Sequence, residues 1–176
     1  MIPSAGPQLL LPVKPWFIGV SLLVGLTFNM LQNMGLWGQS SWVPDWLSVV
    51  LVFWTIHQPR HVGIGVAFIL GLLMDVHQAG LLGAHALAYS VLSYFTTTLH
   101  RRLLWFPLFA QALQILPLFV LTHAMELIAR MVNGDDFPGW TLLLAPCIEA
   151  ILWPLCSLIL IAPQLRAPDP DANRPL

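Results

Sequence analysis

Acidic residues and histidines that could take up a proton or bind a ligand lie inside strongly apolar stretches of this sequence. Asp75, His77 and His85 fall within the segment GLLMDVHQAGLLGAHALAY, and Glu149 falls in the middle of another apolar run. A charged carboxylate at the centre of a membrane helix costs about 3 kcal/mol, so Glu149 must be protonated or paired. Two interpretations stay open: Glu149 is a functional group, or it is a neutral acid that donates to a carbonyl freed by a nearby proline.

Asp75 stands at the C-terminal end of a predicted helix, where a negative charge is unfavourable toward the helix dipole. We therefore expect its carboxylate to serve a second element. The nearest is the start of the following helix, whose first N–H groups need an acceptor. Asp75 is thus predicted to cap that helix, with proton or ligand handling as the alternative. His77 is predicted to be a solvated residue of the intervening loop.

A polar stripe runs along the helix after this turn. Helical spacing places four polar side chains on one face: His85, Tyr89, Ser93 and Thr96. Such a stripe must face protein rather than lipid. Hydrogen bonds between helices would explain it, and a polar cavity for a small ligand is the alternative.

Two other polar sets recur at helical spacing. Asn29, Gln32 and Asn33 share a face of the first apolar segment and are predicted to contact either the bundle or a partner protein. Glu126 and Arg130 stand in the favourable i, i+4 order and are predicted to form an ion pair.

Small residues form a stripe on the segment that ends at Asp75. Gly63, Ala67 and Gly71 are spaced by four and therefore lie on one helical face. A small-xxx-small pattern of this kind lets a second helix approach closely. We expect another helix to pack against this face.

Motifs for catalysis and metal binding do not occur in the sequence. It contains no serine-nucleophile motif, HExxH, Walker loop or CxxC. His57 and His61 are four apart, but Pro59 between them disfavours two ligands on one helix. Cys147 and Cys156 lie in an apolar run and are predicted to be core residues. We expect no enzyme, no metal and no cofactor, and the net charge of -1 offers no basic patch for nucleic acid.

The composition assigns the class of protein. Of 176 residues, 57% are hydrophobic and 9% are charged, with a mean hydropathy of +0.77. Globular proteins contain about 25% charged residues, so we expect an all-α membrane protein with one domain. The predicted transmembrane helices are residues 16–37, 44–56, 62–76, 81–100, 105–132 and 140–162. A flexible lead (1–15) precedes the transmembrane domain (16–162), and a disordered tail (163–176) follows it.

Helices 44–56 and 62–76 are shorter than a membrane span. At 1.5 Å per residue they reach roughly 20 Å, against a hydrocarbon core of about 30 Å. They either span where protein surrounds them, which we favour, or form a re-entrant hairpin. The hairpin would move Arg60 to the outer side.

Basic residues predict the orientation. If both termini lie in the cytoplasm, Arg130 is the one basic residue on the outer side. This orientation satisfies the positive-inside rule, which places an excess of Lys and Arg in cytoplasmic loops. The basic residues predicted inside are Lys14, Arg60, Arg101, Arg102, Arg166 and Arg174. Among these, Arg101 and Arg102 are predicted to anchor the chain to phospholipid headgroups.

The segment from Pro44 to Leu118 resembles the MreD family of rod shape-determining proteins. The likeness rests on a G-L-L-x-D core followed by L-G-x-x-A-L-x-Y, and on the tryptophan-containing PDW segment typical of proteobacterial members. The matching residues are Gly71, Leu72, Leu73, Asp75, Leu82, Gly83, Ala86, Leu87 and Tyr89.

This resemblance implies a non-catalytic scaffold in the bacterial inner membrane that supports lateral wall synthesis and rod shape. Its implied direct partner is MreC, and the implied wider complex contains MreB, a SEDS-type glycosyltransferase and a class B penicillin-binding transpeptidase. The family is also distantly similar to the six-helix S-components of vitamin transporters. The alternative function is therefore an S-component-like subunit that binds a small molecule in a cavity lined by groups such as His85, Tyr89, Glu126 and Glu149.

Overall fold

Six α-helices make up most of the protein in a computed structural model that describes residues 14–32, 34, 42–79, 81–134, 137 and 139–164. No strand occurs among these residues, so the all-α class is confirmed. The helices are α1 (Pro15–Leu31), α2 (Trp46–His57), α3 (Ile64–Gln78), α4 (Ala84–Leu103), α5 (Leu108–Val132) and α6 (Leu144–Ile161), with short 3-10 helices η2 (Trp140–Leu143) and η3 (Ala162–Gln164).

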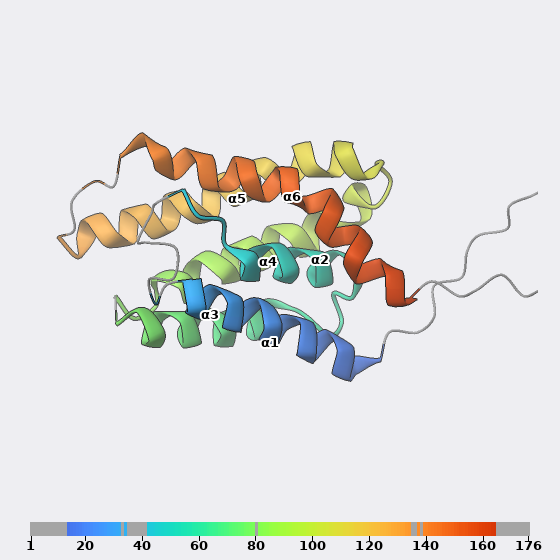
Figure 1. The fold of residues 1–176 in the computed structure, drawn as a ribbon, viewed down its shortest axis with the longest axis horizontal. Helices are drawn as coiled ribbons and strands as arrows, with labels where there is room; N and C mark the ends of the chain where they lie inside the picture. Colours follow the sequence, from blue (N-terminus) through green and yellow to red (C-terminus); the bar gives the residue numbers. More distant parts are fainter. Residues whose placement is uncertain are drawn as a thin grey trace, which may run out of the picture.

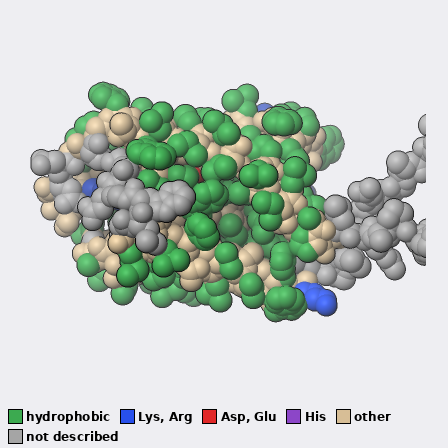
Figure 2. All heavy atoms as spheres, in the orientation of Figure 1, with side chains coloured by type: hydrophobic (Ala, Val, Ile, Leu, Met, Phe, Trp, Pro, Cys, Tyr) green, Lys and Arg blue, Asp and Glu red, His purple; other side chains and the backbone are tan. Residues whose placement is uncertain are grey.

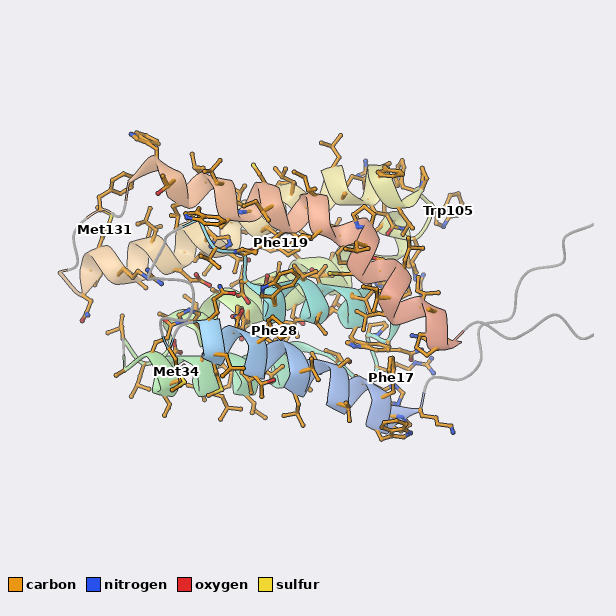
Figure 3. The ribbon with its side chains drawn as sticks, in the orientation of Figure 1. Phe17, Phe28, Met34, Trp105, Phe119 and Met131 are labelled. Atoms are coloured by element: carbon orange, nitrogen blue, oxygen red, sulfur yellow. The ribbon has the colours of Figure 1, made fainter. Side chains whose placement is uncertain are left out.

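Successive helices run in opposite directions along one bundle (Figure 1). Both ends of the described chain, at Lys14 and Gln164, therefore lie at the same end of the bundle, which we call the basal end. Trp105 in the α4–α5 connection marks this end, and Met131 near the end of α5 marks the opposite, distal end (Figure 3). An even number of antiparallel helices requires this placement of the ends.

Helix α2 is the centre of the bundle. It packs against α1, α4 and α6, and Leu47, Leu51 and Phe53 are fully buried. Its apolar side chains therefore point in every direction, as expected of a helix enclosed on all sides. This enclosure explains how a helix of 12 residues, about 18 Å long, can be stable within the bundle.

Helices α3 and α4 approach each other most closely at Gly71. A Cβ atom added there would lie 2.4 Å from Ala86 Cα and 2.6 Å from His85 O. Ala67, one turn earlier, is fully buried. Gly63 does not belong to this contact, because it is the extended N-cap of α3 and its nearest neighbour is Pro59 O at 3.8 Å. The predicted small-residue stripe is therefore correct for two of its three members.

The exposed surface is strongly apolar. Figure 2 shows a face covered by hydrophobic side chains with few charged ones. Two segments, Leu108–Val132 and Trp140–Gln164, are long and apolar enough to cross a membrane. Helices α2 and α3 both pack on α4, but they do not pack closely on each other. The two short helices are thus not a closely packed hairpin, and six complete spans remain a prediction.

Several predicted boundaries differ from the structure. Pro44 precedes α2 rather than beginning it, because Asp45 is the N-cap. Pro146 lies in the first turn of α6, where no intrahelical N–H bond is lost. Pro117 and Pro154 do lie inside α5 and α6. The end of the predicted helix 16–37, most of the lead and most of the tail fall outside the described residues.

Candidate functional site

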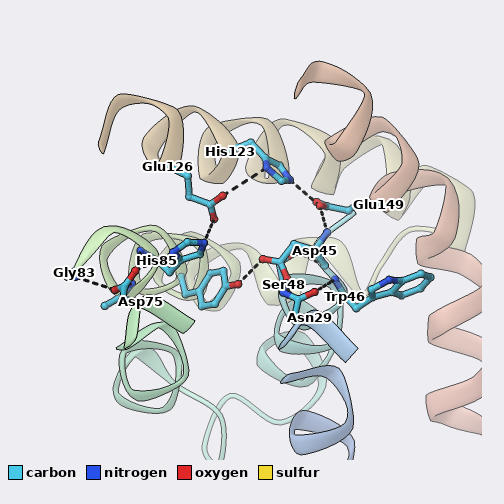
Figure 4. Close-up of polar contacts among 12 residues, drawn as sticks. Asn29, Asp45, Trp46, Ser48, Asp75, Gly83, His85, His123, Glu126 and Glu149 are labelled. Atoms are coloured by element: carbon cyan, nitrogen blue, oxygen red, sulfur yellow. Dashed lines mark hydrogen bonds and ion pairs between the residues drawn. The ribbon is translucent and has the colours of Figure 1, made fainter. Parts of the chain in front are cut away.

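Polar side chains from all six helices meet at the distal end (Figure 4). We call this set the distal network. It comprises Asn29, Asp45, Asp75, His85, Tyr89, His123, Glu126 and Glu149. All of them except Asp45, which is partly exposed, are buried.

Asp75 caps α4, as predicted. Its carboxylate accepts hydrogen bonds from the backbone N–H groups of Gly83 at 2.9 Å, His85 at 2.8 Å and Ala86 at 3.2 Å. It also lies 2.9 Å from His85 Nδ1. Gly83 has no side chain to cap the helix and a φ of 101° that favours glycine. The acceptor therefore comes from α3, which joins the two helices through a buried charge.

Asp45 ties three helices together. Its side chain caps α2 by accepting from the Ser48 N–H at 3.0 Å. It also accepts hydrogen bonds from the Asn29 amide of α1 and the Tyr89 hydroxyl of α4. In return, Asn29 Oδ1 accepts from the Trp46 N–H at 3.1 Å. The polar face of α1 is therefore engaged inside the bundle, and Asn33 lies outside the described residues.

Glu149 is paired rather than lone. Its Oε1 lies 2.7 Å from His123 Nε2 and accepts the Asp45 N–H at 2.8 Å, while its Oε2 has no hydrogen-bond partner. The side chain is fully buried. No bond to a carbonyl freed by proline is found for this carboxylate, so pairing with histidine is how the chain accommodates it.

Glu126 lies between the two histidines. Its Oε1 is 4.0 Å from His85 Nε2, and its Oε2 is 3.8 Å from His123 Nδ1. The predicted ion pair with Arg130 is wrong, because Glu126 faces the interior whereas Arg130 is exposed. The i, i+4 spacing permitted the pair, but the histidines of the bundle offered Glu126 partners on its buried side.

His77 also differs from its prediction. It belongs to the last turn of α3, and its Nε2 lies 3.1 Å from Met30 O of α1. The helix continues past Val76, which carries the imidazole to a neighbouring helix instead of into a loop. The contact links α3 to α1.

The polar stripe of α4 faces protein, as expected. His85, Tyr89, Ser93 and Thr96 are all buried. Hydrogen bonds to other elements are made by His85 and Tyr89, whereas the hydroxyl groups of Ser93 and Thr96 have no hydrogen-bond partner. The structure brings His85, Tyr89, Glu126 and Glu149 into one network, as the ligand-binding alternative required, yet these groups mainly contact one another and Asp45.

His123 was missed at the sequence level, and so was the central part played by Asp45. The signal for His123 was available: it is an ionisable residue inside an apolar segment, three residues before Glu126. Asp45 stands directly before an apolar run with a serine three residues on, which is the pattern of an N-cap.

Carboxylates and imidazoles alternate along the network from Asp75 through His85, Glu126 and His123 to Glu149. The carboxylates of Asp45 and Asp75 also lie at the N-termini of α2 and α4, where the dipole favours negative charge. Within the described ranges no three acidic, histidine or cysteine side chains are grouped as a metal site. The arrangement joins helix ends by paired charges, so its first consequence is rigidity.

Replacing Tyr89 with phenylalanine tests the contact between α4 and Asp45. The change leaves one oxygen of the Asp45 carboxylate without its donor. We expect a loss of about 2 kcal/mol in unfolding free energy. Thermal unfolding in mild detergent measures it. Tyr94→Phe is the matched control, because Tyr94 lies on the same helix but is 55% exposed, and equal losses for both variants would contradict the assignment.

A double-mutant cycle tests the pair of His123 and Glu149. His123→Gln removes the charged partner of Glu149, and Glu149→Gln removes the charged partner of His123. Each variant should therefore destabilise the protein strongly. The double variant should lose less than the sum, with a coupling of about 1–3 kcal/mol. Additive losses in unfolding would show that the 2.7 Å contact carries no energy.

Comparison with known proteins identifies the family of this chain. The family model described as rod shape-determining protein MreD matches residues 12–161. A protein named rod shape-determining protein MreD from Haemophilus influenzae is 27% identical over 150 residues, which cover 85% of this chain and 81% of that protein. No solved structure matches, so the expected likeness to S-components stays a prediction.

The family match covers most of the residues that form the bundle and all of the distal network. It agrees with an all-α structure, a strongly apolar surface and two helices able to cross a membrane. The chain therefore belongs to the MreD family of rod shape-determining membrane proteins.

Proposed function

We propose that this protein is a non-catalytic scaffold of the bacterial inner membrane that binds MreC and supports lateral peptidoglycan synthesis. The observation that carries the proposal is the distal network, whose buried charges are engaged mainly with one another. Such a network fixes helix ends in one arrangement, and a fixed surface in the membrane plane is what a scaffold must offer a partner. The family match supports the link to cell shape.

We propose six membrane spans with the basal end in the cytoplasm. Lys14, Arg60, Arg101 and Arg102 all belong to this end, whereas Arg130 belongs to the distal end. The positive-inside rule favours this orientation. Exposed tryptophans near helix ends agree with it, since such residues prefer the membrane–water interface.

The surface proposed for MreC lies away from the small-residue stripe of α3 and from the polar face of α1. Ala67 and Gly71 are covered by α4, and Asn29 is bonded to Asp45, so these groups are not open to a partner. Gly19 of α1 and Gly65 of α3 have open space at the Cβ position. Because α1 and α3 touch and both start at the basal end, a single partner helix could pack close to both glycines.

Affinity purification of the tagged full-length chain from its native cells, in mild detergent and read by mass spectrometry, tests the scaffold proposal. We expect MreC, MreB, the SEDS-type glycosyltransferase and the class B transpeptidase. A Gly19→Leu and Gly65→Leu double variant should fold normally but recover less MreC. Recovery of an ATPase pair with its membrane coupling subunit, and of no wall proteins, would overturn the proposal.

That second outcome would favour the small-molecule binder. The observation that supports a small-molecule-binding function is that Glu126 Oε1 and Glu149 Oε2 are buried without hydrogen-bond partners. Two unpaired carboxylate oxygens near two histidines could receive the donors of a polar ligand. We place this function second because the remaining polar atoms of the network are engaged with one another.

A further inference from the structure

We propose that the basal end of α4 holds a binding site for the phosphate group of an anionic phospholipid, formed by Arg101, Arg102 and Trp105. These residues and Phe106 line a shallow, open hollow in the connection between α4 and α5. The site is separate from the distal network, which lies at the other end of the bundle.

The end of α4 explains why the two arginines and the two aromatic residues line the same hollow. Leu103, the last residue of α4, is buried and fixes the helix end against the bundle. The chain then turns through hydrogen bonds from Trp105 N–H to Arg102 O and from Phe106 N–H to Leu103 O. This turn folds the aromatic residues back beside the arginines. Trp105 is 90% exposed and projects from the basal end (Figure 3).

Local charge favours an anion here. The four carboxylates of the described side chains, Asp45, Asp75, Glu126 and Glu149, all belong to the distal network. No ion pair to Arg101 or Arg102 is found within the described part of the chain. Guanidinium groups present planar N–H donors that match phosphate oxygens in bidentate fashion.

The apolar side chains around the hollow favour a lipid over a free phosphate. Leu104 and Phe109 flank the turn and are 46% and 81% exposed. They offer an acyl chain a surface next to the arginines, while the Trp105 ring suits the level of the headgroup. A small soluble anion would use only the arginines and would leave these apolar groups in water.

Native mass spectrometry of the full-length chain tests the site. The protein is released from nanodiscs that contain equal amounts of phosphatidylglycerol and phosphatidylcholine, and the retained lipids are counted. We expect the unaltered chain to retain phosphatidylglycerol preferentially. Arg101→Gln with Arg102→Gln should lower this preference by more than about fivefold per arginine, since a basic residue near an anionic surface contributes about that factor through the field alone and the site adds direct contacts.

A matched control removes the same charge from the same end. Lys14→Gln with Arg60→Gln lowers the basal charge equally but leaves the hollow intact, so it should lose clearly less of the preference than the variant at Arg101 and Arg102. An equal loss in both double variants would overturn the site in favour of a diffuse field. Displacement of the lipid by millimolar glycerol 3-phosphate would also overturn it, because a free phosphate would then suffice.

A third outcome points to a protein. If the Arg101→Gln and Arg102→Gln variant kept its lipid preference but lost a cytoplasmic protein in affinity purification, the hollow would be an acidic-peptide site and the lipid proposal would be wrong. None of these readouts depends on recovery of MreC, so the lipid site and the scaffold function can fail independently.

Discussion

Gly71→Ala is expected to separate α3 from α4 and to lower the melting temperature sharply. The new Cβ would lie 2.4 Å from Ala86 Cα and 2.6 Å from both Ala86 N and His85 O. These are backbone atoms of a helix, so no side-chain rotation can relieve the contact. Overpacking of a core costs about 1–3 kcal/mol, and we expect a loss at or above the top of that range in thermal unfolding.

Gly65→Ala is the matched control for this prediction. Gly65 belongs to the same helix, but nothing lies within 4 Å of an added Cβ. Alanine there should leave the protein as stable as before or slightly more stable, because alanine is the better helix former by about 1 kcal/mol. If Gly71→Ala and Gly65→Ala had the same melting temperature, the close approach of α3 and α4 would be incorrect.

Asp75→Ala is expected to have a similarly large effect. It removes the acceptor of three backbone N–H groups and the partner of His85 Nδ1 in a buried position. A buried donor left without its acceptor costs about 1–3 kcal/mol, and three backbone donors lose their acceptor here. We expect a lower melting temperature, a lower purified yield and less retained MreC. Unfolding and affinity purification measure these three effects.

Asp75→Asn separates the charge from the shape. The amide keeps one acceptor oxygen and nearly the same volume, so it should lose less stability than alanine. An Asp75→Ala protein with unchanged melting temperature and unchanged partner binding would rule out the cap. A large effect of alanine with none of asparagine would show that geometry matters at Asp75 more than charge.

Much of the fold was accessible from the sequence because apolar segments and prolines are local signals. The predicted segments 62–76, 81–100 and 105–132 differ from α3, α4 and α5 by three residues or fewer at each end. The cap by Asp75 also followed from local logic, since a carboxylate at a helix C-terminus needs a partner and the next helix begins nine residues later. The polar stripe of α4 was predictable from spacing alone.

The long-range contacts were not accessible in this way. Glu149 was expected to need a partner, but spacing cannot show that His123 of α5 supplies it or that Asp45 joins them. Glu126 illustrates the opposite error. The spacing along α5 predicted a pair with Arg130, whereas the bundle places Glu126 between His85 and His123. The enclosure of α2 on all sides also depends on contacts with other helices. The hydropathy of the α2 segment alone cannot predict it.

The bond between Asp45 and Glu149 has a consequence for biosynthesis. The two residues are 104 positions apart in the chain, so the N-terminal cap of α2 lacks this partner until the last helix has been synthesised. A growing chain that has not yet produced α6 leaves the Asp45 N–H and the His123 imidazole without their common partner and exposes one flank of α2 to the lipid. Chains that stop before α6 should therefore be recognised by membrane proteases, and only finished chains should accumulate.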